Sequence, residues 1–289
     1  MYEIVTDSGC NLSHELIKKN NIYIVPLYLI VDGEPHANYL REEDEEKIKG
    51  FYESLRNKTP MSTSCVNQEV CEETFSKILD SGKDLLYISM STGISASYMV
   101  ASKILDELKL KYPNRKIYHV DSLCAALGQG LLVLSIADIR DRGGSVEEAY
   151  DFAENNKLKV CHLFTVETLT YLYRGGRVKK SAKLLADTLN IKPIMYANSN
   201  GYIAPLGKVF GRKMSLNSIA KRAAENIINP ETQTLYIAHG DCIKDAEYLA
   251  ARIKDKISVK EVAIQILDMV IGTHSGPGTI ALFYYGNGR

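Results

Sequence analysis

Two hydroxyl-rich segments of this sequence could bind a carboxyl or phosphate group. Residues 91–97 read Ser-Thr-Gly-Ile-Ser-Ala-Ser and separate an apolar strand-like run from a helical pattern. A turn of this kind offers hydroxyl donors, free backbone N–H groups and the positive end of a helix dipole, all of which favour anions. Plain N-capping by serine would give the same pattern. The second segment, Ser62-Thr63-Ser64, precedes a helix predicted over residues 68–79 and is open to the same two interpretations.

A histidine follows much later, within a glycine-rich segment. Residues 272–279 read Gly-Thr-His-Ser-Gly-Pro-Gly-Thr, which predicts a tight and poorly packed loop. His274 could point from this loop into a cleft or lie on the surface. Both hydroxyl segments are expected near the carboxyl ends of the parallel strands, where open α/β sheets bind ligands. Together the segments favour a ligand site more than any of them does alone.

Two further clusters have simpler interpretations. His239-Gly240-Asp241-Cys242 resembles a set of metal ligands, but no further ligand pattern lies nearby, so we interpret it as a turn at a strand end and expect no metal. Five basic residues without an intervening acid form a local positive patch, or a solvated helix face: Arg174, Arg177, Lys179, Lys180 and Lys183.

The composition narrows the class of protein. Thirty-five Lys and Arg balance 35 Asp and Glu, which argues against broad nucleic-acid or membrane-surface binding. The longest apolar run, residues 22–31, is too short to span a bilayer and contains Pro26. No signal peptide is evident, and the six cysteines are scattered without a C-x-x-C pair. We therefore expect a cytoplasmic protein with reduced cysteines and no integral membrane segment.

The strands and helices predicted around these segments indicate an α/β fold. In the first half, strands are predicted over residues 3–6, 23–30, 84–90 and 116–120, with helical segments between them. One helix is expected over residues 12–19 with Asn11 as its cap, and a capping box is expected at Ser145. Residues 41–49 form a charge run interpreted as a solvated helix start. This alternation predicts a mostly parallel sheet with helices on both faces.

After about residue 157 the pattern changes. Residues 192–197 and 202–209 flank Asn198-Ser199-Asn200-Gly201, which predicts a hairpin. Helices over residues 213–228 and 243–254 and strands over 234–238, 259–267 and 279–284 complete a second α+β domain with a mixed or antiparallel sheet. We therefore predict two domains, residues 1–157 and 158–289.

At this point six motifs, in order along nearly the whole chain, resemble those of the DegV family. They are Asp7-Ser8, Thr63-Ser64, Ser91-x-Gly93-x-Ser95, Arg174-Gly175-Gly176-Arg177, Ile191-Lys192-Pro193 and Gly272-x-His274-x-Gly276-Pro277-Gly278. The resemblance implies a non-enzymatic bacterial carrier that holds one long-chain fatty acid between its two domains. It further implies that the acyl carboxyl is presented to a fatty acid kinase, and that no cofactor is needed.

The resemblance also implies roles for individual residues. Thr63 and Ser95 are expected to bind the carboxyl, assisted by Ser64 and the backbone N–H of Ala96, and His274 is expected to close on the same head group. Arg174 and Arg177 are expected to dock the kinase. The sequence departs from the family's pattern at Phe210, where an arginine is expected, and Arg212 is the candidate substitute.

Two alternatives remain open. Gly93-Ile94-Ser95-Ala96-Ser97 is one residue short of the nucleophile elbow of serine hydrolases, with His274 downstream and Asp241 or Asp268 as a triad acid. The final glycine of the elbow is absent, and so is an oxyanion motif of the His-Gly-Gly-Gly type. The other alternative is a sensor of a small carboxylate or phosphorylated metabolite.

Overall fold

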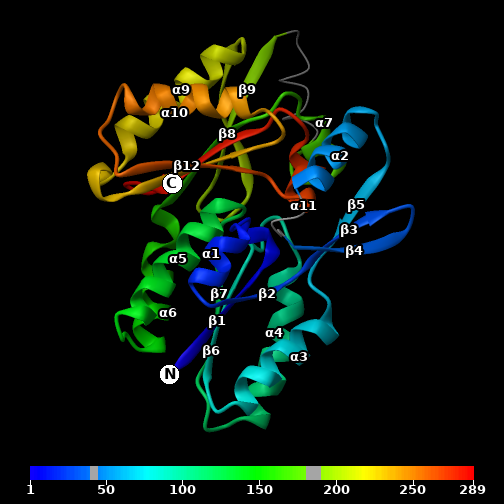
Figure 1. Ribbon diagram of the computed structural model, residues 1–289, viewed down its shortest axis with the longest axis vertical. Coiled ribbons are helices and arrows are strands. Elements are labelled where there is room, and N and C mark those ends of the chain that lie inside the picture. Colours follow the sequence, from blue (N-terminus) through cyan, green and yellow to red (C-terminus); the bar gives the residue numbers. More distant parts are fainter. Residues whose placement is uncertain (40–44, 180–189) are drawn as a thin grey trace.

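The computed structural model describes residues 1–39, 45–179 and 190–289, which form three sheets with helices packed between and around them (Figure 1). The first sheet is parallel, with the strand order β2-β1-β6-β7. Its strands are β1 (Tyr2–Asp7), β2 (Ile22–Val25), β6 (Asp84–Ser89) and β7 (Ile117–Asp121). Both faces of this sheet are covered, as the sequence predicts.

The side chains of β6 point alternately to the two faces of the sheet, and those on both faces are apolar. Leu85 and Tyr87 pack on one face against α3 (Gln68–Asp80) and α4 (Ser97–Lys111), whereas Leu86 and Ile88 pack on the other face with α5 (Leu127–Asp141) and α6 (Val146–Asn156). Each of these four β6 side chains is fully buried. A strand that is apolar at successive positions requires such a two-sided cover.

The second large sheet is mixed, with the strand order β10-β9-β8-β13-β11-β12. Its pairs are antiparallel except for β11 with β12. The strands are β8 (Val160–Thr165), β9 (Ile191–Ala197), β10 (Ile203–Phe210), β11 (Thr234–His239), β12 (Glu261–Ile266) and β13 (Ile280–Tyr285). Helices α9 (Arg212–Asn226) and α10 (Ile243–Lys254) pack on its outer face. The predicted mixed sheet is therefore confirmed.

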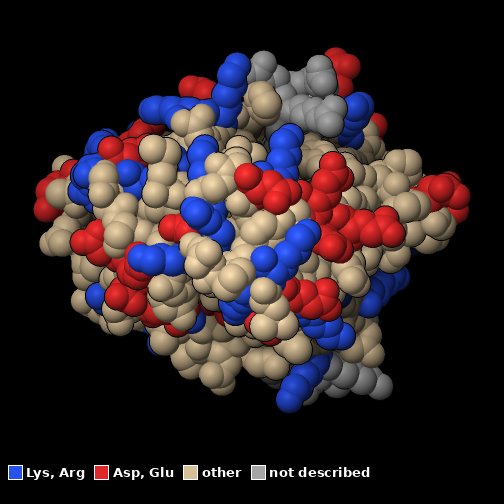
Figure 2. Space-filling model, turned by 90° about the horizontal axis from the view of Figure 1, so that it is seen from below, with Lys and Arg blue, Asp and Glu red and all other residues tan. Residues whose placement is uncertain are grey.

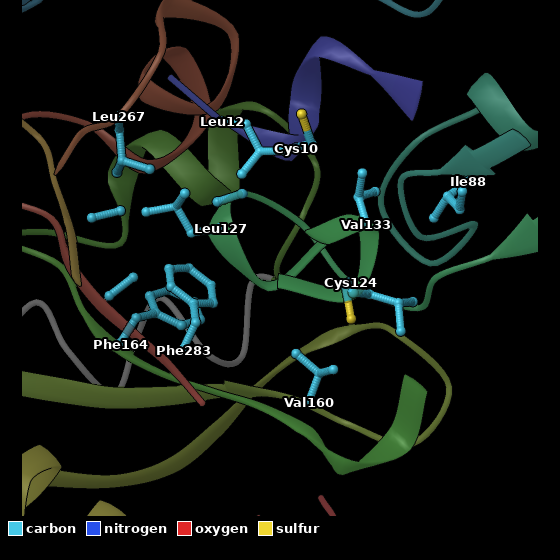
Figure 3. Packing of buried hydrophobic residues seen from close by; sticks show 14 of the residues in the cluster. Cys10, Leu12, Ile88, Cys124, Leu127, Val133, Val160, Phe164, Leu267 and Phe283 are labelled. Carbon is cyan, nitrogen blue, oxygen red and sulfur yellow. The ribbon is translucent and has the colours of Figure 1, made fainter. Parts of the chain in front are cut away.

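Helix α5 lies between the two large sheets. It contacts β1 and β6 of the parallel sheet and β8, β11 and β13 of the mixed one. Leu127 and Val133 are fully buried in the core that the helix shares with both sheets. Figure 3 shows Phe164 of β8 and Phe283 of β13 pointing toward Leu127. This shared core fixes the inner faces of the two sheets against each other.

A small antiparallel sheet lies beside them, with the order β4-β3-β5. It consists of β3 (Leu27–Val31), β4 (Glu34–Asn38) and β5 (Met61–Ser64). Three helices pack around it or on its neighbours, namely α2 (Glu45–Arg56), α7 (Thr170–Arg174) and α11 (Met269–Ser275). The remaining described helices are α1 (His14–Lys19) and the 3-10 turns η1 (Ser8–Cys10), η3 (Lys157–Lys159) and η4 (Pro230–Thr232).

Several local predictions are wrong, and each has a physical reason. Residues 23–30 are two strands in different sheets, because Pro26 lacks the N–H that a continuous strand needs. Asn11 is not the cap of α1, which begins after Ser13, whose hydroxyl accepts the Leu16 N–H. Asn11 has a left-handed backbone (φ 54°) and instead bonds to the loop before α11.

The segment around Thr63 and the glycine-rich segment around His274 also differ from their predicted secondary structure. Thr63 lies in strand β5 rather than in a helix cap, and Asn67 caps α3 instead. The first half of the predicted loop at residues 272–279 belongs to helix α11, which ends at Ser275, and Gly272, Thr273 and Ser275 are buried. Gly272 is required there by close packing, since a Cβ atom at this position would lie 2.7 Å from the Tyr52 hydroxyl.

Other predictions are confirmed. Ser145 and Glu148 form the expected capping box at α6, and β9 and β10 form the expected hairpin. The charge run at residues 41–49 lies partly outside the described residues, and α2 begins at Glu45. In the part of the chain that the structure describes, no helix combines the length and the apolarity needed to cross a bilayer. The domain boundary at residues 157 and 158 stays a prediction.

Candidate functional site

A cavity of about 390 Å³ lies at the carboxyl ends of the parallel strands, between them and the inner face of the mixed sheet. Most of its lining is apolar, from residues such as Met90, Phe164 and Ile271. The polar lining includes all five side chains or backbone groups that the sequence assigns to the ligand: Thr63, Ser64, Ser95, Ala96 and His274. The structure therefore brings together segments up to 211 positions apart in the chain.

Thr63 and His274 are in direct contact. The Thr63 hydroxyl and His274 Nε2 are 2.7 Å apart, and His274 Nδ1 is buried without a hydrogen-bond partner among the described residues. Burial, and to a smaller extent the positive charge of Arg177, lowers the pKa of His274 to about 4. The ring is thus neutral near pH 7. An orphaned N–H costs more than an orphaned ring nitrogen, which favours the tautomer in which Nε2–H donates to Thr63. The threonine hydrogen is then free to donate to a ligand.

Helix α11 fixes the position of His274. Its N-cap is the buried Asp268, whose Oδ1 accepts the N–H groups of Val270 and Ile271 at 2.8 and 3.0 Å. The same oxygen accepts Asn38 Nδ2 at 2.9 Å, and Asn11 Oδ1 accepts the Asp268 N–H at 2.7 Å. These bonds tie α11 to β4 and to the turn after β1.

Gly175 sets how closely α11 can approach the segment after α7. A Cβ atom at Gly175 would lie 2.1 Å from His274 Nδ1. The backbone of Gly175 is in the ordinary helical region (φ −72°), so the glycine is needed for space and not for its torsion angles. This explains one glycine of the Arg174-Gly175-Gly176-Arg177 motif by a contact that the sequence does not report.

The turn before α4 presents Ser95 and Ala96. Ser95 N–H donates to the Ser91 carbonyl at 3.0 Å, and Ser95 Oγ accepts the Ser97 N–H at 3.2 Å and bonds Ser97 Oγ at 2.9 Å. Ser95 thus satisfies the N–H of the first residue of α4 and also lines the cavity. It is not the N-cap of α4, because that position is Ala96, which makes no side-chain cap bond.

Arg177 lines the cavity at its polar end. Its Nε donates to the Ile94 carbonyl at 2.9 Å, and its Nη1 donates to the Gly175 carbonyl. Burial lowers the pKa of this half-buried guanidinium. The family resemblance implies that Arg177 lies on a docking surface, whereas the structure places its positive charge close to His274, where a carboxylate would be attracted.

The other basic residues lie elsewhere. Arg174 and Lys179 are exposed, whereas Lys180 and Lys183 lie outside the described residues. Arg212 pairs with Asp245 at 2.9 Å and donates to the Gly278 carbonyl at 2.6 Å, so it holds an internal loop rather than standing free for a partner. Figure 2 shows basic and acidic side chains interspersed over one face of the molecule, in keeping with the zero net charge.

The β9–β10 hairpin meets the Ser91 turn beside the cavity. Ser91 Oγ donates to the Gly201 carbonyl at 2.9 Å, and a Cβ atom at Gly93 would lie 2.6 Å from the same oxygen. Gly201 has a φ of 74° and also lines the cavity. The glycines of both turns are therefore needed for this close approach.

The groups of a hydrolytic triad are not assembled among the described residues. Ser95 Oγ bonds to Ser97, whereas His274 bonds to Thr63. No carboxylate orients the His274 Nδ1, because Asp268 caps its helix and Asp241 pairs with Arg56. The described residues likewise contain no cluster of three or more His, Cys, Asp or Glu that could hold a metal ion.

The fold and the site thus define an α/β protein with a largely apolar cavity whose polar end carries hydroxyls, a neutral histidine and an arginine. A family model described as "Uncharacterised protein, DegV family" matches residues 1–287. The chain belongs to the DegV family. A DegV domain-containing protein of Clostridium perfringens is 38% identical over 287 residues, which cover 99% of this chain and 98% of that relative.

Solved structures of the family agree with the fold. A DegV family protein from Thermus thermophilus, described by its fatty acid binding, is 26% identical with a TM-score of 0.87, and the match covers 99% of both chains. A stearic acid-binding protein from Eubacterium ventriosum is 25% identical with a TM-score of 0.84, over 98% of this chain and 97% of that one.

Proposed function

We propose that this protein binds one long-chain fatty acid in the cavity between the two sheets, as a carrier and not as an enzyme. The observation that carries the proposal is the polarity of the cavity: hydroxyls and a guanidinium at one end, and mostly apolar side chains over the rest. The relatives described as fatty acid-binding proteins support it. A small carboxylate would leave the apolar part of the cavity unfilled.

Simple energetics agree with such a ligand. Burying about sixteen carbons contributes roughly 12 kcal/mol, at about 0.8 kcal/mol per methylene. Association and ordering take back several kcal/mol of this. The remainder still allows tight binding, so the polar groups need only orient the carboxyl and satisfy its hydrogen bonds. We assign this role to Thr63, Ser95 and Arg177, with Ser64, the Ala96 N–H and His274 in support.

We further propose that the carboxyl is presented in the cytoplasm to a fatty acid kinase. Ser64 and Ala96 are exposed although they line the cavity, so the polar end lies close to the surface. Arg174 is exposed beside this end and is the candidate docking residue, with the exposed Phe210 at the end of β10 a second contact to test. The family resemblance supports the partner, and the boundary at residues 157 and 158 is proposed with it.

Native mass spectrometry of the purified protein tests the binding proposal. We expect a mass increment of one acyl chain per polypeptide and recovery of a long-chain fatty acid by organic extraction. Repeated preparations without a lipid, together with no binding of added palmitate or oleate, would contradict the proposal. Hydrolysis of a nitrophenyl ester that disappears in both Ser95→Ala and His274→Ala would support the hydrolase instead.

The kinase proposal needs a separate test. Arg174→Glu should weaken kinase-dependent acyl phosphate formation and leave fatty acid affinity unchanged, because Arg174 does not line the cavity. Lys221→Glu, an exposed change on α9, serves as the matched charge control. An equal loss of lipid binding in Arg174→Glu would show that Arg174 contributes to lipid binding or to the stability of the fold, and would contradict a docking role.

A further inference from the structure

The cavity runs along strand β13, away from His274. Thr279 stands next to α11, and its hydroxyl donates to the Ser275 carbonyl at 2.9 Å. Thr279, Ala281 and Phe283 all line the cavity. Alternate residues of a strand point to the same side, so the lining extends over four residue steps, or roughly 13 Å. Phe283 therefore marks the end of the cavity remote from the head-group site.

His162 lies at this far end. It pairs with Phe283 across β8 and β13, and it also lines the cavity. Ala197, another lining residue, follows Tyr196, which pairs with Leu163 on the adjoining strand. His162, Phe283 and Ala197 thus form one row across three strands, and this row closes the cavity opposite the polar end.

The His162 ring is held from several sides. It packs edge to face on Phe283, with ring centroids 5.2 Å apart, and its Nε2 accepts a weak hydrogen bond from the Ala125 N–H at 3.4 Å. A Cβ atom at Gly128 of α5 would lie 2.1 Å from Nε2, so the ring already fills the space that this glycine leaves. Only a small part of the residue, 6%, is exposed. The ring cannot withdraw to admit a longer ligand.

The structure behind the ring is also fixed. The Arg289 guanidinium donates to the carbonyls of Leu123 and Val160 at 2.6 and 2.7 Å, which ties the turn before α5 to the start of β8. Burial, and next the charge of Arg289, lowers the pKa of His162 well below its ordinary value. The wall is therefore uncharged near pH 7 and compatible with a terminal methyl group.

We infer that His162 sets the length of the acyl chain that this protein accepts, by forming the wall against which the methyl end of the ligand stops. This inference rests on the proposed function, since it assumes that the carboxyl is held at the Thr63 end. It concerns the size of the ring and not its protonation. Preference among fatty acids should then follow the volume of the side chain at position 162.

The test is to measure the dissociation constants of saturated fatty acids from twelve to twenty-two carbons. In His162→Ala we expect the preferred chain length to increase by about two carbons. The affinity for this longer acid, relative to the affinity for the acid that the wild type prefers, should rise roughly tenfold. His162→Leu should give a smaller increase. Ala197→Leu, which adds volume in the same row, should shift the preference toward shorter chains.

Leu172→Ala is the matched control, because Leu172 lines the cavity from α7, beside the head-group site. It should lower affinity by a similar factor at all lengths. Since the readout is a ratio between ligands, a variant with reduced stability still reports the preference, and Ala197→Leu tests the wall even if His162→Ala fails to fold. The same length profile in wild type, His162→Leu and Ala197→Leu would overturn the inference. A wild-type protein that binds no fatty acid at any length would instead overturn the proposed function.

Discussion

The hydroxyl of Thr63 is the group on which the proposed head-group site depends most directly. In the tautomer favoured above, its oxygen accepts from His274 and its hydrogen is left for a ligand. We therefore propose that His274 acts at least in part by orienting Thr63, and the expectation that the imidazole also closes on the carboxyl stays a prediction. The neutral ring adds no charge, so Arg177 supplies the positive charge at this end of the cavity.

Thr63→Val should weaken fatty acid binding by about 1–2 kcal/mol, since it deletes one donor at nearly constant shape. His274→Ala should cost a similar amount, and the double variant should cost less than the sum because both changes act on one hydroxyl. The measurement is titration with a fluorescent fatty acid. Thr232→Val, an exposed threonine in a distant turn, is the control. Full additivity would show that His274 acts independently of Thr63.

Gly175→Ala should lower fatty acid affinity by tenfold or more. The added methyl would meet His274 Nδ1 at 2.1 Å, so either the ring or the segment after α7 must move. Gly50→Ala is the matched control, because a Cβ at that position in α2 meets nothing within 4 Å. We expect the control to retain affinity and to gain up to about 1 kcal/mol of stability. Unchanged lipid affinity in Gly175→Ala would mean that the position of His274 is unimportant.

Helix α11 is the element that carries the site, and a buried carboxylate begins it. Burial raises the pKa of Asp268 to about 6 from an ordinary value near 4. The folded chain thus binds this proton more readily than the unfolded chain, and the contribution of Asp268 to stability falls as the pH rises from about 4 to about 6. One oxygen, Oδ2, has no hydrogen-bond partner among the described residues.

Asp268→Asn should therefore stabilise the protein relative to wild type increasingly between pH 4 and pH 6, by on the order of 1–3 kcal/mol in total, with a plateau above pH 6. The asparagine oxygen can still accept at the Oδ1 position and cap the helix. Urea unfolding of both proteins at several pH values measures the difference. Asp106→Asn, at an exposed position on α4, should show little change across the same range. A difference that is independent of pH would show that Asp268 keeps its ordinary acidity.

Elements with a clear local signal could be predicted from the sequence. The bounds of α10 agree with the predicted residues 243–254, and Asn-Gly marks the β9–β10 turn. The division of residues 22–31 at Pro26 had a signal that the prediction did not use. Helix α11 had none, since its glycines indicate a loop and only packing against Tyr52 shows why Gly272 is tolerated there.

Which residues lie together was more predictable from the sequence than their geometry. The ordered motifs predicted that Thr63, Ser95 and His274 share a site, and all three line one cavity, although their role in binding stays a prediction. The place of Arg177 could not be read from its basic neighbours, because whether an arginine faces solvent or a cavity depends on the course of the chain after α7. Gly175 and His162 act through contacts with segments 99 and 34 positions away, which no local pattern encodes.

The whole molecule is built around α5 and the cavity at its N-terminal end, so filling the cavity should stabilise the entire fold. We expect removal of the bound lipid to lower the melting temperature and added long-chain fatty acid to restore it. A ligand at one hundred times its dissociation constant adds about 2.7 kcal/mol to the free energy of unfolding. Differential scanning fluorimetry measures this. Butyrate at the same concentration is the control, because it cannot fill the apolar part. Equal melting temperatures with and without the long-chain acid would contradict binding to the folded state.

The link between Asn11 and Asp268 has a consequence for the order of events in the cell. These residues are 257 positions apart and yet directly bonded. A ribosome that adds 5–20 residues per second needs roughly 13–50 seconds to make the intervening chain. During that time the turn after β1 exists without α11, and the cavity lacks one of its walls. Under the proposed function, we therefore expect a fatty acid to be loaded only after synthesis of the chain has passed α11.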